Sequence, residues 1–179
     1  MSADSFNQYA RQEQVTDSFL HTLQQNNEVV LAFAVETFAW AKTVNYHIIA
    51  LNKNEWKGYT YYINKSSGNL SKLMEVSVSE DECSAVWKFI QDKQAWKIKG
   101  DDGTGFCSGS QKSNCNINDG AGWRLLIIIK DKIADPAYYE PAFYEECCPG
   151  NEERKLFIEV SDKIKNAVKL NDNGAENKE

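Results

Sequence analysis

Four of the five cysteines could do chemistry together. Cys107 and Cys115 lie in a polar stretch, and the vicinal pair Cys147 and Cys148 comes directly before Pro149-Gly150. Four thiolates are a ligand set that Zn²⁺ accepts, so a metal site would form if the polar stretch folded onto the vicinal pair. The spacing argues against zinc, because structural zinc sites are usually built from Cys-x-x-Cys pairs. We therefore predict no metal and no cofactor. The alternative is a metal site formed by these four cysteines.

The redox state of the cysteines is predicted from their number. Five is an odd number, it is low for a disulfide scaffold, and the cysteines recur at no common spacing. We expect reduced thiols, with a bridge such as Cys107–Cys115 only in an exported protein. Cys83 falls on the apolar face of a predicted helix, where we expect a small buried hydrophobic residue.

Hydrolytic catalysis would need a nucleophile with a base within hydrogen-bond reach. The chain has two histidines, His21 and His47, and neither belongs to an HExxH motif. No GxSxG or SxxK motif occurs either. We expect both histidines to be surface or edge residues, and we predict a non-catalytic protein.

A glycine-rich stretch separates the two halves of the chain. Six of the ten glycines fall within residues 100–122, together with serines, asparagines and aspartates. The stretch holds no phosphate-binding glycine motif and does not match the spacing of a calcium-binding EF-hand loop. It is either a mobile hairpin tip or a functional loop.

The most distinctive segment is a tandem pentapeptide, Pro136-Ala137-Tyr138-Tyr139-Glu140 followed by Pro141-Ala142-Phe143-Tyr144-Glu145. From Ile133 to Glu153 there are six acidic residues and no lysine or arginine. Aromatic side chains anchor protein interfaces and carboxylates steer a basic partner. The prolines equally allow an irregular connection whose tyrosines cover the edge of a sheet. The predicted contact residues are Asp135, Tyr138, Tyr139, Glu140, Phe143, Tyr144, Glu145 and Glu146.

Composition limits the partners and the compartment. The 179 residues include 20 Lys and Arg against 26 Asp and Glu, a net charge of −6, so we exclude nucleic acid as a partner. The first residues lack a secretory signal, and the longest apolar run, Val29 to Val35, is shorter than the ~20 residues of a membrane span. We expect a cytoplasmic protein without membrane contact, with one domain over residues 1–170 and a polar tail over residues 171–179.

Several elements must position these residues. Apolar periodicity predicts a helix over residues 4–26 and a strand over Val29 to Val35, with a helix continuing to Trp40 as the alternative. Residues 44–50 and 59–63 alternate as a hairpin, and Met74, Val76 and Val78 mark a strand that is wet on one face. A capping box at Ser79 and Glu82 begins a central helix.

The second half of the chain supplies the remaining elements. Trp96 and Ile98 suggest a short strand, while Trp123 to Ile129 is apolar on both faces and is expected to be central. The last helix begins near Asn151 and turns Phe157, Val160, Ile164 and Val168 inward. We predict an α+β fold, a mainly antiparallel sheet of five or six strands covered on one face by N-terminal, central and C-terminal helices.

These observations favour a non-catalytic domain that binds another, basic protein. A more specific version is an immunity-like or antitoxin-like inhibitor that docks its acidic aromatic surface on a basic toxin. The alternative is an enzyme or a ligand-binding or metal-binding protein with a thiol-based or carboxylate-based site under the glycine-rich stretch. A third class is an exported protein with disulfide bonds.

Overall fold

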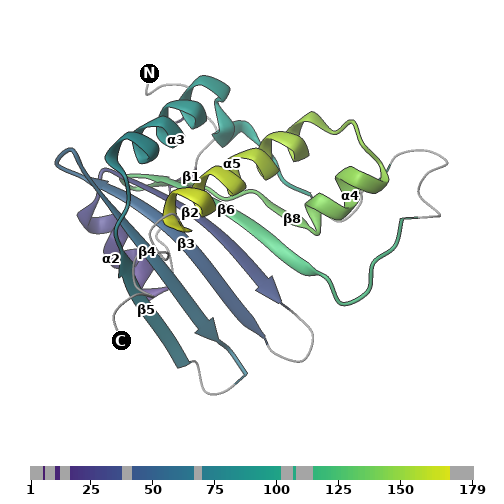
Figure 1. Ribbon diagram of the computed structural model, residues 1–179, viewed down its shortest axis with the longest axis horizontal. Helices are drawn as coiled ribbons and strands as arrows, with labels where there is room; N and C mark the ends of the chain where they lie inside the picture. Colours follow the sequence, from purple (N-terminus) through teal and green to yellow (C-terminus); the bar gives the residue numbers. More distant parts are fainter. Residues whose placement is uncertain are drawn as a thin grey trace, which may run out of the picture.

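One antiparallel sheet organises the chain. The computed structural model describes residues 6, 11–12, 17–37, 42–66, 70–101, 107 and 115–169. Within these residues eight strands form the sheet in the order β1-β7-β6-β2-β3-β4-β5, and β8 pairs with β6 (Figure 1). The strands are β1 (Arg11–Gln12), β2 (Val29–Thr37), β3 (Thr43–Asn52), β4 (Glu55–Asn64), β5 (Leu70–Val76), β6 (Ala121–Ile129), β7 (Lys132–Ala134) and β8 (Ala137–Tyr139).

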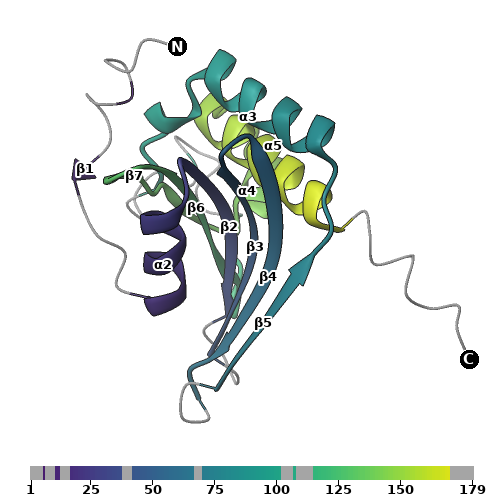
Figure 2. The ribbon, with the colours of Figure 1, turned by 90° about the vertical axis from the view of Figure 1, so that its left-hand side faces the viewer.

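Helices lie on both faces of this sheet. Figure 2 shows α2 (Ser18–Asn26) on one face and α3 (Glu80–Lys93) and α5 (Glu152–Lys169) on the other. The short α4 (Pro141–Cys147) lies beside the start of α5 in Figure 1. The α+β class and the antiparallel sheet are confirmed. Cover on one face only was wrong, because β2 is apolar on both of its faces and each face needs a partner.

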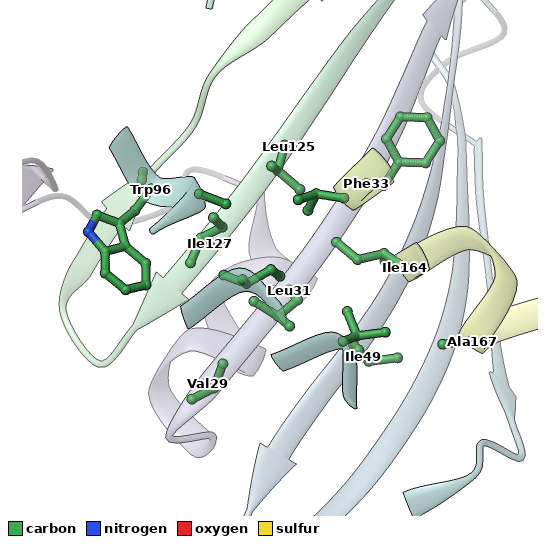
Figure 3. Close-up of a cluster of buried hydrophobic side chains, with 14 of the residues drawn as sticks. Val29, Leu31, Phe33, Ile49, Trp96, Leu125, Ile127, Ile164 and Ala167 are labelled. Carbon is green, nitrogen blue, oxygen red and sulfur yellow. The ribbon is translucent and has the colours of Figure 1, made fainter. Parts of the chain in front are cut away.

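The alternation of side chains along β2 divides the core in two. Val29, Leu31 and Phe33 pack with residues of β6 and α5, and Figure 3 shows Leu31 and Phe33 near Leu125 and Ile164. The intervening side chains, Val30, Ala32 and Ala34, pack with Leu20 and Leu23 of α2. β6 repeats the same alternation, so the prediction that it is a central strand apolar on both faces is confirmed.

Local capping fixes where the helices begin. The Asp17 carboxylate accepts hydrogen bonds from the backbone N–H groups of Phe19 and Leu20 at 2.9 and 3.0 Å. Ser79 Oγ accepts from the N–H of Glu82 at 3.4 Å, which is one of the two hydrogen bonds of the predicted capping box. Asn151 Oδ1 accepts from the N–H of Arg154 at 3.0 Å, which places the start of α5 where the sequence predicted it.

Two predicted elements and one alternative were wrong. Arg11–Gln12 is a strand paired with β7, not part of a helix over residues 4–26. Residues 95–97 form a 3₁₀ helix in place of a strand, because Gln94 takes a left-handed conformation that ends α3 and turns the chain. β2 stays extended to Thr37, so the alternative helix in this region fails over the described residues. Residues 38–41 and the tail 171–179 lie outside the described ranges.

Candidate functional site

Two disulfide bonds tie the glycine-rich stretch to α4. Cys107 is bonded to Cys148 and Cys115 to Cys147, with Cα–Cα distances of 5.7 and 6.0 Å. The prediction of reduced thiols is therefore wrong for these four residues, and so is the Cys107–Cys115 pairing. Vicinal cysteines cannot reach each other easily, whereas each can bridge to a separate point of the facing loop. Residues 102–106 and 108–114 of the stretch lie outside the described ranges.

Aromatic residues of α4 enclose the bridged cysteines. Cys107, Cys148 and Tyr144 are buried together, with Phe143 and Ile117 packed against them. The rings of Phe143 and Tyr144 meet edge to face at a centroid distance of 5.1 Å. We call the four bridged cysteines, Cys107, Cys115, Cys147 and Cys148, the cysteine cluster.

Cys83 is the remaining thiol. It is free and fully buried in α3, as predicted, and burial followed by the nearby charges of Glu80 and Glu82 raises its pKa to about 12. A thiol in this state is a poor nucleophile at neutral pH, because it stays protonated and shielded from reagents.

A buried arginine connects α4 to α5 next to the cysteine cluster. The side chain of Arg154 is 2% exposed; its Nε donates to Glu145 Oε2 at 2.9 Å and its Nη2 donates to the Cys148 carbonyl oxygen at 2.6 Å. Burial acts to raise the pKa of Glu145. Hydrogen bonds from the Gly150 N–H and from Arg154, with the charges of Arg154 and Lys155, outweigh that effect and hold the pKa below its usual range. Glu145 is therefore an internal ion-pair partner.

The predicted contact residues lie in β8, in α4 and beside them. Of these eight residues, Glu146 alone is exposed. Tyr138 and Tyr144 are buried, and Asp135, Tyr139, Glu140, Phe143 and Glu145 are half-buried. Tyr138 packs on Phe157 with ring centroids 4.8 Å apart. Burial, then the charges of Glu153 and Asp101, raises the pKa of Tyr138 to about 12.

The other carboxylates of this segment have internal partners. Asp135 forms an ion pair with Arg124 at 2.7 Å, and Glu140 accepts a hydrogen bond from the Ala121 N–H. The hydroxyl of Tyr139 accepts from the Gly120 N–H at 2.8 Å. We correctly predicted from the sequence that these residues lie close together. The sequence could not show that many of their polar atoms form internal contacts that join β8 and α4 to β6.

The largest exposed apolar side chains gather elsewhere, at the other end of the sheet. Among the described residues the exposed large hydrophobic side chains are Leu70, Leu73 and Met74 of β5 and Tyr62 of β4, exposed by 66, 47, 45 and 36%. β5 is the last strand of the sheet, and no described strand pairs with its outer edge. In Figure 1 it forms the left-hand margin of the sheet, opposite α4.

The register places these side chains on both faces of β5. Lys72 lies opposite Tyr62, so Leu70 and Met74 share the face of Tyr62, whereas Leu73 lies opposite Tyr61 on the other face. The pairing between β4 and β5 is continuous from Gly58–Val76 to Asn64–Leu70. We did not predict this surface from the sequence, because Met74, Val76 and Val78 indicated a strand with only one face in water. The sequence does contain a signal for it, because large apolar residues occur at both even and odd positions from Leu70 to Met74.

Three cavities lined by described residues offer less chemistry. Their volumes are about 240, 290 and 210 Å³. His21 lines the second, with its Nε2 at 2.8 Å from Gln25 Nε2. No serine, threonine or cysteine lines any of the three, so none of these cavities joins a hydroxyl or thiol nucleophile to a histidine. His47 instead stacks on Phe33 at a centroid distance of 6.3 Å.

No protein-family model and no curated protein matches this chain. Within the described ranges, the chain contains no helix of the length and apolar character that crossing a bilayer requires.

Proposed function

We propose that this protein is a non-catalytic protein-binding domain whose main contact element is the edge strand β5. The exposed apolar side chains of β5 carry the proposal. All but one of its seven residues are exposed, and three of the seven are Leu70, Leu73 and Met74. A monomeric protein usually protects such an edge, since unpaired backbone N–H and C=O groups flanked by apolar side chains invite pairing with another chain.

The usual protective features are sparse on β5. It contains no proline, its register with β4 has no bulge, and Lys72 is its one lysine. The opposite end of the sheet differs, because β7 is covered there by β1. An extended segment of a partner could add a strand to β5, with backbone hydrogen bonds supplying affinity.

The side chains define the chemistry of that segment. Leu70 and Met74 on one face and Leu73 on the other favour a partner strand that is apolar on both faces. Lys72 and Glu75 would favour opposite charges at the facing positions. The partner surface is therefore an extended, apolar protein segment, and neither nucleic acid nor a small cofactor is part of the proposal.

The experiment is a comparison of three immobilised baits. The wild-type chain and the variant Ala85→Lys should capture the same partner from extracts of the source cells, whereas Leu73→Lys/Met74→Lys should lose it. Ala85 is exposed on α3, so the control adds a lysine without touching β5. A partner retained equally by all three baits, or none captured by the wild type, would contradict the role of β5.

The acidic end of the molecule is a second contact surface of the same proposed function. The exposed carboxylates of Glu146, Glu152 and Glu153 support this surface. An immunity-like or antitoxin-like inhibitor would need such an acidic surface to bind a basic toxin. Glu146→Lys is the cleanest charge reversal, since Glu140 and Glu145 hold internal hydrogen bonds. It should weaken binding of a basic partner at least about tenfold, while Asp92→Lys on α3 should not. Equal affinities of these two variants would rule this surface out.

The compartment belongs to the same proposal. The predicted cytoplasmic location would expose the two bridges to a reducing environment, and disulfide bonds persist mainly in oxidising compartments. The bridges therefore favour an oxidising compartment over the cytoplasm. Immunolocalisation in the source cells, with fractionation as a check, distinguishes the two.

A further inference from the structure

The cysteine cluster holds the sulfur atoms of two bridges at one point. The Sγ atoms of Cys107, Cys115 and Cys148 all lie within 4.8 Å of one another. The fourth sulfur, that of Cys147, is bonded to Cys115. Four cysteine sulfurs are the complete ligand set of a structural zinc site.

The sulfur positions can be compared with those of such a site. With Zn–S bonds of about 2.3 Å, the sulfurs of a tetrahedral site lie about 3.8 Å apart. The sulfur of Cys115 is at most about 1 Å farther than this from those of Cys107 and Cys148. The sulfurs of the two bonded pairs, Cys107–Cys148 and Cys115–Cys147, have to move apart to this separation once they are reduced. The spacing objection raised by the sequence also weakens, because the neighbouring Cys147 and Cys148 both reach sulfurs of the same cluster.

The surroundings suit an anionic metal site. Cys107 and Cys148 are 5 and 6% exposed and are packed against Tyr144, so water is largely excluded. Four thiolates and one Zn²⁺ carry a net charge of −2. The Arg154 guanidinium lies next to this charge, since it donates to the Cys148 carbonyl oxygen at 2.6 Å, and it shares its own positive charge with Glu145.

We propose that, when both bridges are reduced, Cys107, Cys115, Cys147 and Cys148 together bind one Zn²⁺ ion. Reduction needs two molecules of a dithiol, which give four electrons and four protons, break the two S–S bonds and are themselves oxidised to disulfides. Zn²⁺ then displaces four protons from the four thiols as four Zn–S bonds form. Two molecules of the disulfide form of the dithiol reverse the reaction: they accept the four electrons and, with four protons from water, return to dithiols, while the two S–S bonds re-form and Zn²⁺ is released. Residues 107 and 115 therefore stay tied to α4 in both states.

The test uses the full chain, reduced with a dithiol and separated from it by gel filtration without oxygen. Titration with Co²⁺ should reach one equivalent, with thiolate charge-transfer bands and the visible bands of a tetrahedral ion, and one equivalent of Zn²⁺ should remove them. Uptake of less than half an equivalent of either metal by the reduced wild-type chain overturns the proposal, whatever the variants do.

Two variants locate the site. Cys115→Ser should lower the affinity for Co²⁺ at least about tenfold, whereas Cys83→Ala should bind one equivalent with an unchanged spectrum. Tetrahedral thiolate bands of equal strength in Cys115→Ser, or their loss in Cys83→Ala, would place the metal elsewhere and overturn the assignment. The result does not depend on whether β5 binds a partner.

Discussion

Single residues decide how the acidic end of the molecule holds together. Arg154 is the largest buried polar side chain there, and it joins Glu145 of α4 to the carbonyl of Cys148. An arginine this deeply buried is stable only while its donors are satisfied. The sequence marked Glu145 as a contact residue for a partner because it could show the carboxylate but not the cation that faces it.

Replacing Arg154 by methionine should lower the free energy of unfolding by about 2–3 kcal/mol, because Glu145 and the Cys148 carbonyl lose their donor. Urea unfolding measures the change. The control Lys155→Met removes an exposed lysine that also pairs with Glu145, and it should change stability little. Equal losses in the two variants would contradict the role given to Arg154.

Tyr138 should make stability depend on alkaline pH. Its pKa is raised from 10.0 to about 12 in the folded protein, so the unfolded chain releases the proton first as pH rises. The stabilisation is complete below about pH 10 and is lost progressively towards about pH 12. Urea unfolding between about pH 9 and about pH 11 should show a steeper loss for the wild type than for Tyr138→Phe. Parallel curves would mean that Tyr138 is not buried in solution.

At the scale of elements, long periodic segments could be predicted and short ones could not. β2 and β6 are nine residues each, and their continuous apolar runs fixed them as buried strands. β1, β7 and β8 have two or three residues, too few for a period to show, and their pairing depends on contacts with β6 and β7. β5 could be predicted as a strand from its sequence. Its exposure on both faces could not, because that depends on how far the helices on each face of the sheet extend.

Hydrogen exchange of the isolated protein should rank the strands. Backbone amides of β5 should exchange well before those of β2 and β6, because β5 is exposed and pairs on one edge only, while β2 and β6 lie inside the sheet. Mass spectrometry of peptides covering each strand measures the order. Protection of β5 as long as that of β2 would show that its edge is already covered in the free protein.

At the scale of the whole molecule, the sheet separates two candidate surfaces. β5 is the last strand of the sheet, and Figure 1 shows α4, which contains Cys147 of the cysteine cluster, on the opposite side of the molecule. The sequence suggested, as an alternative, that the four cysteines meet at one site. Their pairing into disulfide bonds could not be predicted from their spacing. The paired cysteines are 41 and 32 residues apart, so which of them meet depends on how the chain folds back onto α4 and not on local spacing.

Reduction should destabilise the whole protein without dissolving the sheet. Each bridge closes a loop of 41 or 32 residues and is worth about 4 kcal/mol in the chain-entropy account, with less than the sum for two overlapping loops. Circular dichroism should show an unchanged sheet signal and a lower melting temperature in reductant, equally in Cys83→Ala. An unchanged melting temperature would mean that the bridges are absent in solution.

We propose above all that β5 accepts a strand from a partner protein. The most direct measurement is amide hydrogen exchange of this protein with and without the partner that the wild-type bait captures. We expect slowed exchange along Leu70–Val76 when the partner is bound. Slowed exchange confined to α4 and the start of α5, with β5 unaffected, would contradict it and assign binding to the acidic end.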